Sequence, residues 1–136
     1  MRINELLHWQ WQGYPRYHRS RNGLLAHILL VPVFLVANVW LIAALVRGSW
    51  LVALTAAAAV VASIALQGVG HRFEALPPEP FTGAANSVLR ILLEQWVTFP
   101  GFVLIGGWSS ALRRASTAQP AAVELIRSHR EGASYE

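Results

Sequence analysis

The stretch that decides the fold is residues 24–46, LLAHILLVPVFLVANVWLIAALV, which contains no formal charge. A helix of this length can span the hydrocarbon core of a bilayer, which is about 30 Å thick. Residues 50–70 form a second apolar run that is rich in alanine, and Arg47-Gly48-Ser49 separates the two runs. We therefore expect a helical hairpin in a membrane, with small side chains that let the helices approach closely.

A third apolar run, residues 87–108, is less regular than the first two. Arg90 and Glu94 lie four residues apart in it, so we expect them to pair along one helix face. The sequence Thr98-Phe99-Pro100-Gly101 predicts a break in the helix, which makes the run either re-entrant or two short crossings. The predicted fold is all-α: a small multi-pass helical membrane protein, with a helical hairpin and a broken third segment.

The whole chain, residues 1–136, is expected to form a single integral membrane domain. In the N-terminal interfacial segment, tryptophans and tyrosines alternate with arginines, and a short helix over residues 3–12 should end at Gly13 and Pro15. The tail includes one amphipathic piece, residues 121–129. The expected parts are the interfacial segment (1–23), two spans (24–46 and 50–70), a proline-rich loop (71–87), the broken third segment (87–108) and a cytoplasmic tail (109–136).

Composition limits the chemistry that the chain can perform. The 136 residues are 54% hydrophobic and 13% charged, and they include no cysteine, lysine or aspartate, so any metal site must use histidine and glutamate. The basic pI of about 10.7 comes from arginines at the edges of apolar runs, which favours an anionic membrane surface over nucleic acid. The positive-inside rule then places both termini in the cytoplasm, and the expected location is a bacterial inner membrane.

The hairpin should bring distant histidines to one depth. His27 lies 19 residues before the end of the first span and His71 lies 21 residues after the start of the second. At 1.5 Å per residue, both should lie about 30 Å from the shared turn, on the side that holds the N-terminus and His18. His18 can join them only if the helix breaks between residues 18 and 27, and Asn22-Gly23 is the expected break.

Several roles are open for these residues. His71 and Glu74 lie three apart and share one helix face, so they either take part in chemistry or simply cap a helix end at the membrane surface. His27 alone is compatible with a satisfied polar residue near the headgroups, and His18 with a lipid-phosphate contact. His8 and His129 carry no expected role. Glu94 as a metal ligand is an alternative to its pairing with Arg90.

The residues also resemble a known family. Tyr17-His18, Asn22, His27 and Pro32, followed by Gln67-x-x-Gly70-His71, Phe73-Glu74 and a proline loop, are similar to the membrane family of the fungal 2-hydroxy fatty acid dioxygenase of phytosphingosine breakdown. The resemblance covers roughly residues 14–108. The family often has Asn-Lys where this chain has Asn22-Gly23, and a longer spacing before its glutamate.

The resemblance implies a membrane-embedded iron(II) enzyme that uses dioxygen to shorten a 2-hydroxy fatty acid, or a related lipid, by one carbon. It implies His18, His27 and His71 as iron ligands. We expect Glu74 as a fourth ligand or as a residue that orients one, and Arg72 or Arg19 against the substrate carboxylate. Two alternatives stay open: a non-enzymatic protein that binds lipid or a protein partner, and a haem protein ligated by His27 and His71. Oligomeric state and substrate chain length are left open.

Overall fold

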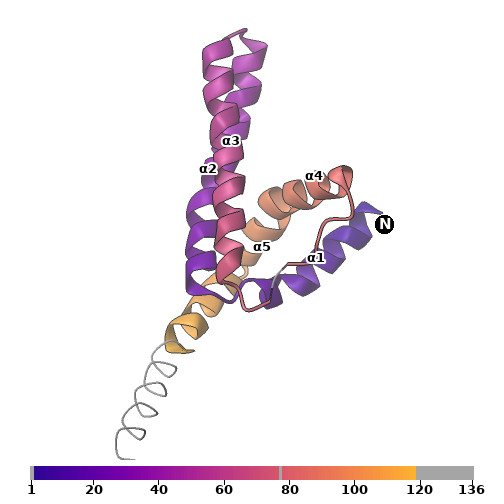
Figure 1. Ribbon diagram of the computed structural model, residues 1–136, viewed down its shortest axis with the longest axis vertical. Helices are drawn as coiled ribbons and strands as arrows, with labels where there is room; N and C mark the ends of the chain where they lie inside the picture. The colour runs from indigo at the N-terminus through magenta and orange to yellow at the C-terminus, as the bar shows by residue number, and fades with distance from the viewer. Residues whose placement is uncertain (1, 77, 119–136) are drawn as a thin grey trace, which may run out of the picture.

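The computed structural model describes residues 2–76 and 78–118, and its regular elements there are all helices (Figure 1). Three stretches, Arg21–Val46, Trp50–Gly70 and Ala84–Leu104, are long and apolar enough to cross a membrane. The predicted fold class is confirmed. The elements are α1 (Ile3–Tyr17), α2 (Arg21–Val46), α3 (Trp50–Gly70), the short 3₁₀ helix η1 (His71–Phe73), α4 (Ala84–Leu93), the π-helical η2 (Glu94–Thr98), α5 (Phe99–Leu104) and a further helix over residues 107–118.

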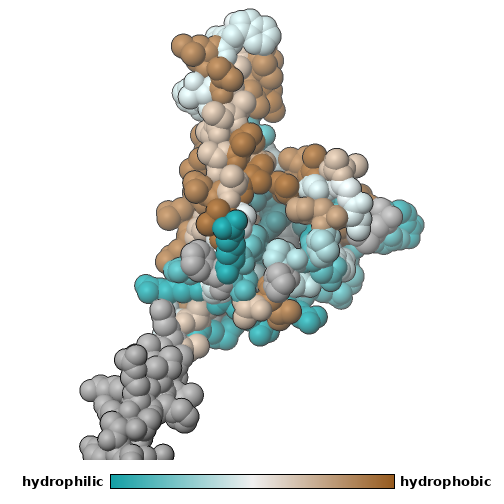
Figure 2. Space-filling model, viewed as in Figure 1, coloured by the Kyte–Doolittle hydropathy of each residue, from teal (hydrophilic) through white to brown (hydrophobic). Residues whose placement is uncertain are grey.

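Helices α2 and α3 form the predicted hairpin and lie side by side along the long axis of the molecule (Figure 1). Gly48 makes the turn with a φ of +66°, a left-handed conformation that glycine adopts without strain. The buried residues between the two helices include several alanines, among them Ala37, Ala44, Ala53 and Ala56. The outer surface of the hairpin is hydrophobic for most of its length, whereas hydrophilic residues gather at its base and around α1 (Figure 2).

The two hairpin helices are in close contact at their base. A Cβ atom added at Gly70 would lie 3.3 Å from the Cβ of Ala26 and 3.8 Å from the Cα of Gly23. Glycine and alanine are therefore required here for steric reasons, as is common where membrane helices touch. This close packing fixes the level of His71, which directly follows Gly70, relative to the first turns of α2.

The third segment contains an irregular stretch, which lies about one turn before the predicted break. The break predicted at residues 98–101 is replaced by the π-helical stretch η2, in which the N–H of Phe99 donates to the carbonyl oxygen of Glu94. Pro100 has no N–H and its ring crowds the carbonyl four residues before it, so a wider turn just ahead of Pro100 relieves the conflict. The extra residue in that turn lets Glu94 and Gln95, and then Thr98 and Phe99, face the protein interior.

The N-terminal segment differs from the prediction in two respects. Helix α1 runs through Gly13 and Pro15 to Tyr17, so the helix continues for one more turn although Pro15 cannot donate to the carbonyl oxygen of Trp11. The break before α2 lies at residues 18–20 and not at Asn22-Gly23, because Ser20 caps α2 by accepting a hydrogen bond from the N–H of Gly23.

The other boundaries shift by a few residues. The loop is confined to residues 74–83, since η1 extends the hairpin to residue 73 and α4 begins at Ala84. Residues 107–118 are helical, although residues 109–118 were predicted to belong to the tail. The expected amphipathic piece at residues 121–129 and His129 lie outside the described residues.

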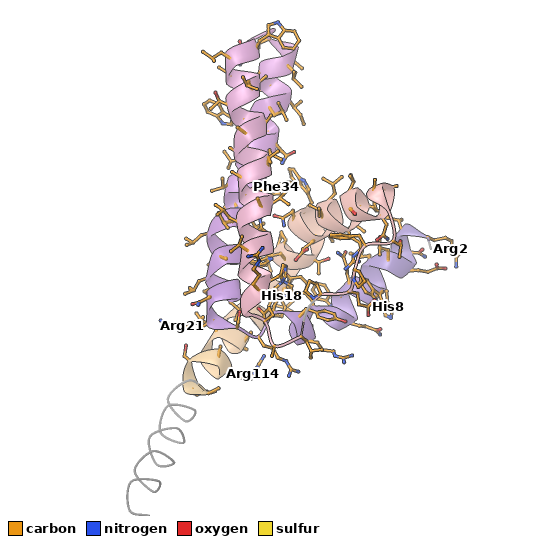
Figure 3. All side chains as sticks on the ribbon, viewed as in Figure 1. Arg2, His8, His18, Arg21, Phe34 and Arg114 are labelled. Atoms are coloured by element: carbon orange, nitrogen blue, oxygen red, sulfur yellow. The ribbon has the colours of Figure 1, made fainter. Side chains whose placement is uncertain are left out.

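Helix α1 and the third segment pack against the lower half of the hairpin. Figure 1 shows α4 starting to the side of the hairpin, near the N-terminal end of α1, and the chain descending from there through α5 to the hairpin base. Figure 3 shows His18 inside this junction, Arg21 and Arg114 at its outer edge, and His8 on the far part of α1. The core that holds the junction together consists of Tyr14, Leu24, Val31, Phe99, Phe102 and Ala111.

We expect Gly23→Ala to destabilise the protein, although alanine is the better helix former by about 1 kcal/mol. An added Cβ would collide with the Glu74 carboxylate and lie 2.7 Å from Ser20 Oγ, and both groups are held by hydrogen bonds. Overpacking of this kind costs about 1–3 kcal/mol. Gly68→Ala in α3 is the matched control, because nothing lies within 4 Å of its Cβ position. Thermal unfolding in detergent, followed by circular dichroism, should show a lower midpoint for Gly23→Ala only.

Candidate metal centre

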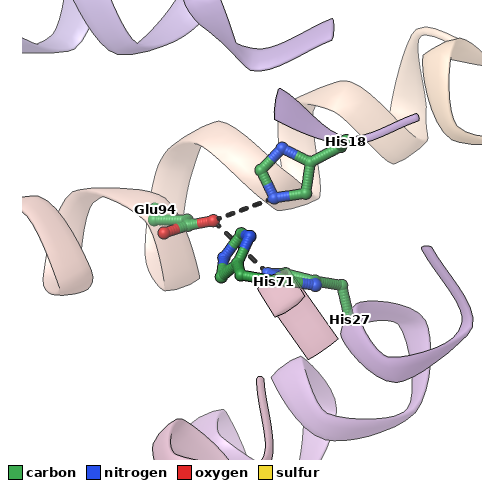
Figure 4. A group of neighbouring side chains, drawn as sticks. All are labelled: His18, His27, His71 and Glu94. Atoms are coloured by element: carbon green, nitrogen blue, oxygen red, sulfur yellow. Dashed lines mark ion pairs between the residues drawn. The ribbon is translucent and has the colours of Figure 1, made fainter. Parts of the chain in front are cut away.

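Four side chains from separate segments converge at the base of the hairpin (Figure 4). His18 follows α1, His27 lies in the second turn of α2, His71 begins η1 and Glu94 begins η2. One nitrogen or oxygen atom from each residue lies within 4.8 Å of the others, and His18 and His27 are 4% and 1% exposed. The three histidines thus lie together at one depth, as the hairpin argument predicts. We call these four residues the His/Glu cluster.

The two buried histidines present lone pairs to the centre of this cluster. Nδ1 of His18 lies 3.1 Å from the carbonyl oxygen of Tyr14, and Nδ1 of His27 lies 3.0 Å from that of Gly23. Because a carbonyl oxygen only accepts, each Nδ1 must carry the proton, and Nε2 of the neutral ring is then an acceptor. Histidines that ligate metals commonly donate their other N–H to a carbonyl in this way.

Glu94 faces the same two nitrogens at ion-pair distance, as the dashed lines in Figure 4 mark, but beyond the length of a strong hydrogen bond. Its Oε1 lies 3.4 Å from Nε2 of His18 and 3.5 Å from Nε2 of His27. A charge-assisted hydrogen bond between imidazolium and carboxylate would be about 2.7–2.9 Å long, so the distances do not match such a bond. Within the described residues, Nε2 of His18, Nδ1 of His71 and Oε1 of Glu94 are buried without a hydrogen-bond partner.

The donor set of the cluster fits a divalent transition metal. Three imidazoles and one carboxylate suit iron, zinc, copper or nickel, whereas calcium and magnesium prefer an all-oxygen site. The ligand atoms lie within 4.8 Å of one another, close to the roughly 4.2 Å between two ligands on opposite sides of such an ion. A cation there would satisfy acceptors that each cost about 1–3 kcal/mol if left unpaired.

His71 is held in the neutral form that a metal requires. Its pKa is lowered from 6.5 to about 4, mainly by burial and then by the neighbouring His18 and His27, against the opposing charges of Glu94 and Glu74. A His71 ring with this pKa is almost fully neutral at pH 7. Binding a cation at neutral pH therefore displaces no proton from His71.

Glu74 lies beside the cluster and outside its ligand set. Oε2 accepts hydrogen bonds from the backbone N–H groups of Arg19 and Ser20, both at 2.9 Å, and Oε1 accepts one from Ser20 Oγ at 2.8 Å. These bonds hold the break between α1 and α2, which turns His18 inward. Glu74 was expected either to be a fourth ligand or to orient one, and its position outside the His/Glu cluster fits the orienting role.

The reciprocal amide pair of Gln67 and Gln95 positions Glu94. Nε2 of Gln95 donates to Oε1 of Gln67 at 2.7 Å, and Nε2 of Gln67 donates to Oε1 of Gln95 at 3.2 Å. Both side chains are buried, so the pair firmly joins η2 to α3. Glu94, the neighbour of Gln95, is thereby held against the histidines.

The expected pairing of Arg90 with Glu94 is wrong. The Arg90 guanidinium donates to the carbonyl oxygens of Glu79 and Pro80 at 3.1 and 3.2 Å, and its Cζ lies 4.8 and 4.7 Å from the ring centroids of Trp9 and Phe81. The two aromatic rings and the loop carbonyls satisfy Arg90, which leaves Glu94 free to face the histidines. Arg72 is exposed and is not among the residues that line the cavity described below.

A cavity of about 270 Å³ adjoins the His/Glu cluster, between α1, α3 and the third segment. All four residues of the cluster contribute to its wall, and most of the remaining lining is apolar or aromatic. A space of this kind holds the apolar part of a ligand while the cluster contacts its polar end. The apolar and aromatic lining includes Trp9, Tyr14, Ile64, Phe81 and Ile91.

Tyr14 is the aromatic residue of this wall that lies closest to the cluster. Its ring stacks on that of His18, with 3.9 Å between centroids and 17° between planes, and its edge meets Phe102. The side chain is 5% exposed and its hydroxyl has no hydrogen-bond partner in the described part of the chain. Burial, followed by the charge of Glu94, raises the pKa of Tyr14 well above its ordinary value, so the hydroxyl keeps its proton.

Fold and site together define a small helical membrane protein with a buried His/Glu group at metal-binding distance. Comparison of the chain with protein-family models, with curated proteins and with solved structures finds no match. The assignment of a metal and of a reaction therefore depends on the geometry of the cluster and on the residue pattern.

Sequence reasoning ranked one residue of the site too low and missed another. Glu94 as a metal ligand was kept only as the alternative to its pairing with Arg90, and the signal in its favour was a carboxylate within an apolar segment where water cannot compensate its charge. Tyr14 was treated only as an interfacial aromatic residue. Its four-residue spacing from His18 was the available signal, because such a spacing brings side chains on one helix into contact.

We expect the metal-free protein to lose stability as the pH falls from about 6.5 to about 4. Over this range the unfolded state binds a proton at His71 that the folded state does not, which favours unfolding; below pH 4 this contribution stops changing. Thermal unfolding in the presence of a chelator should show a steeper decline for the wild type than for His71→Asn. Equal slopes in the two proteins would contradict the assigned pKa.

Proposed function

We propose that the chain is a membrane-embedded iron(II)-dependent dioxygenase that acts on 2-hydroxy fatty acids or a related lipid. The observation that carries the proposal is the convergence of one possible ligand atom from each of His18, His27, His71 and Glu94, of which the atoms of His18, His71 and Glu94 include buried ones without a hydrogen-bond partner in the described residues. The choice of iron and of the lipid rests on the resemblance of the Tyr17-His18 and Gln67-x-x-Gly70-His71 patterns to the dioxygenase family.

In this proposal, the three histidines and Glu94 hold the metal, and their second contacts keep them oriented. Iron(II), when bound there, would activate dioxygen, while the 2-hydroxy acid itself would supply the four electrons as it is oxidised to the shorter acid and carbon dioxide. Tyr14 and Gly23 fix the tautomers of His18 and His27 through their carbonyl oxygens, so both rings are ready to ligate without a proton transfer. Glu74 holds the chain break that aims His18.

The cavity beside the cluster provides room for part of the acyl chain. Its apolar lining excludes water from one side of the cluster, which protects a reactive site from hydrolytic side reactions. With α1 at the base of the hairpin, a lipid would approach from the membrane surface. We place that surface, both chain ends and the site on the cytoplasmic side of a bacterial inner membrane, because arginines flank the hairpin base.

Purified protein reconstituted anaerobically with iron(II) should bind about one metal ion per chain. His27→Ala and Glu94→Gln should each lower the affinity for iron or cobalt by about tenfold or more, because each removes a ligand from a buried site. The measurement is metal content after gel filtration, with titration by cobalt absorption. His8→Ala is the matched control, since His8 is exposed, pairs with Gln12 on its own helix and is not part of the His/Glu cluster. A wild type that retains no transition metal would overturn the metal centre.

The iron-loaded protein should consume dioxygen when a 2-hydroxy fatty acid is added, and should release a product one carbon shorter. A fatty acid of equal length without the 2-hydroxyl group is the control substrate. Oxygen uptake with an electrode and product mass would be measured in detergent or nanodiscs. Tight metal binding without oxygen uptake on any 2-hydroxy acid would favour the non-enzymatic alternative, in which the cluster is structural. A Soret band in the purified protein would instead indicate haem.

A further inference from the structure

The Tyr14 hydroxyl is a buried donor without a hydrogen bond. Within the described residues it has no hydrogen-bond partner, although the side chain is only 5% exposed and the Glu94 carboxylate lies close enough to raise the pKa of Tyr14. An unsatisfied buried hydroxyl is unusual and costs about 1–3 kcal/mol of desolvation. Such a group calls for an explanation, and its place in the wall of the cavity supplies one.

The ring that carries this hydroxyl is held on two sides. Tyr14 stacks on His18 with a centroid distance of 3.9 Å and contacts Phe102 at 5.1 Å. The stacking aligns the phenol with an imidazole whose Nε2 faces the centre of the cluster. A donor thus lines the cavity beside a set of acceptors that together fit a metal ion.

We propose that the Tyr14 hydroxyl is the hydrogen-bond donor for an exogenous anionic or oxygen-donor ligand that occupies an open position on the metal. This inference rests on the proposed metal centre. The ligand would accept from Tyr14 with one atom while contacting the metal, so both the orphaned hydroxyl and the ion's open position are satisfied at once. Tyr14 is therefore a ligand-binding residue of the site and more than a packing residue.

The Tyr14 hydroxyl has a second possible role. The charge of Glu94 reaches Tyr14, so a small movement could let the hydroxyl donate to that carboxylate and simply support a metal ligand. The two roles differ in what they stabilise. Support of Glu94 would change the affinity for the metal, whereas donation to an incoming ligand would change the affinity of the metal-loaded protein for that ligand.

The chain contains a matched control in Tyr17, which lies three residues away and lines the same cavity. Its hydroxyl already donates to Oε1 of Glu79 at 3.3 Å, away from the His/Glu cluster. Tyr17→Phe removes one oxygen atom from the same helix and the same cavity wall as Tyr14→Phe. Only the position relative to the cluster differs.

The experiment uses full-length wild type, Tyr14→Phe and Tyr17→Phe, each loaded with one cobalt(II) per chain. Azide is titrated into each protein and its binding is followed by the visible absorption of cobalt. We expect Tyr14→Phe to weaken azide binding by about tenfold or more, the effect of losing a hydrogen bond to a charged acceptor. Tyr17→Phe should stay within about twofold of the wild type, and cobalt affinity should be unchanged in both variants.

Several results would overturn the assignment of Tyr14. Equal azide affinity in Tyr14→Phe and wild type would do so, as would a loss confined to cobalt affinity or a wild-type cobalt protein that binds no azide; each leaves the metal centre itself standing. A wild type that binds no cobalt would overturn both proposals. If Tyr14→Phe does not fold, 3-fluorotyrosine at position 14 serves instead: its more acidic hydroxyl should tighten azide binding, and unchanged affinity would refute the role.

Discussion

The structure depends on the carboxylate of Glu74, which holds the chain break between α1 and α2. Its two oxygens accept three hydrogen bonds from Arg19 and Ser20. The carboxylate also occupies the space that a side chain at position 23 would need, so only glycine fits there. Without the break, His18 and His27 would lie on opposite sides of one helix, nine residues apart. The carboxylate that follows the hairpin therefore determines where the segment before the hairpin turns. His18 reaches the other histidines through that turn.

Around this junction, several polar side chains satisfy one another. Gln67 and Gln95 pair with each other, Arg90 is enclosed by two aromatic rings and loop carbonyls, and Glu74 caps the break. Of the buried side-chain atoms without a partner in the described residues, three belong to the His/Glu cluster and the others to Gln10, Tyr14 and Thr98. Buried acceptors that face one another without partners form a site that suits a cation. The two tyrosines of α1 differ in the same way: the Tyr14 hydroxyl has no partner in the described residues, whereas the Tyr17 hydroxyl donates to Glu79.

The apolar hairpin and the polar junction have different tasks. Most of the hairpin surface is hydrophobic and suits lipid, while the junction holds the charged and aromatic residues at its base (Figure 2). Because the cluster lies at the end of the long hairpin and not at its middle, its charges avoid the centre of the hydrocarbon, where their cost is highest. The cavity between α1, α3 and the third segment adds a mostly apolar space beside the cluster.

The sequence by itself determined the helical hairpin, the shared depth of His27 and His71, and the restriction of any metal site to histidine and glutamate. These conclusions follow from length, periodicity and composition, which are local properties. Only the tertiary structure decided that Glu94 joins the histidines, that Arg90 turns to the loop, and that the break lies at residues 18–20. Each of these depends on which partner lies nearest in space: the π-helical turn before Pro100 aims Glu94, and Glu74 pins Ser20. Spacing along the chain gives the depth of a residue in the hairpin, but it does not say which side chains of other segments it meets.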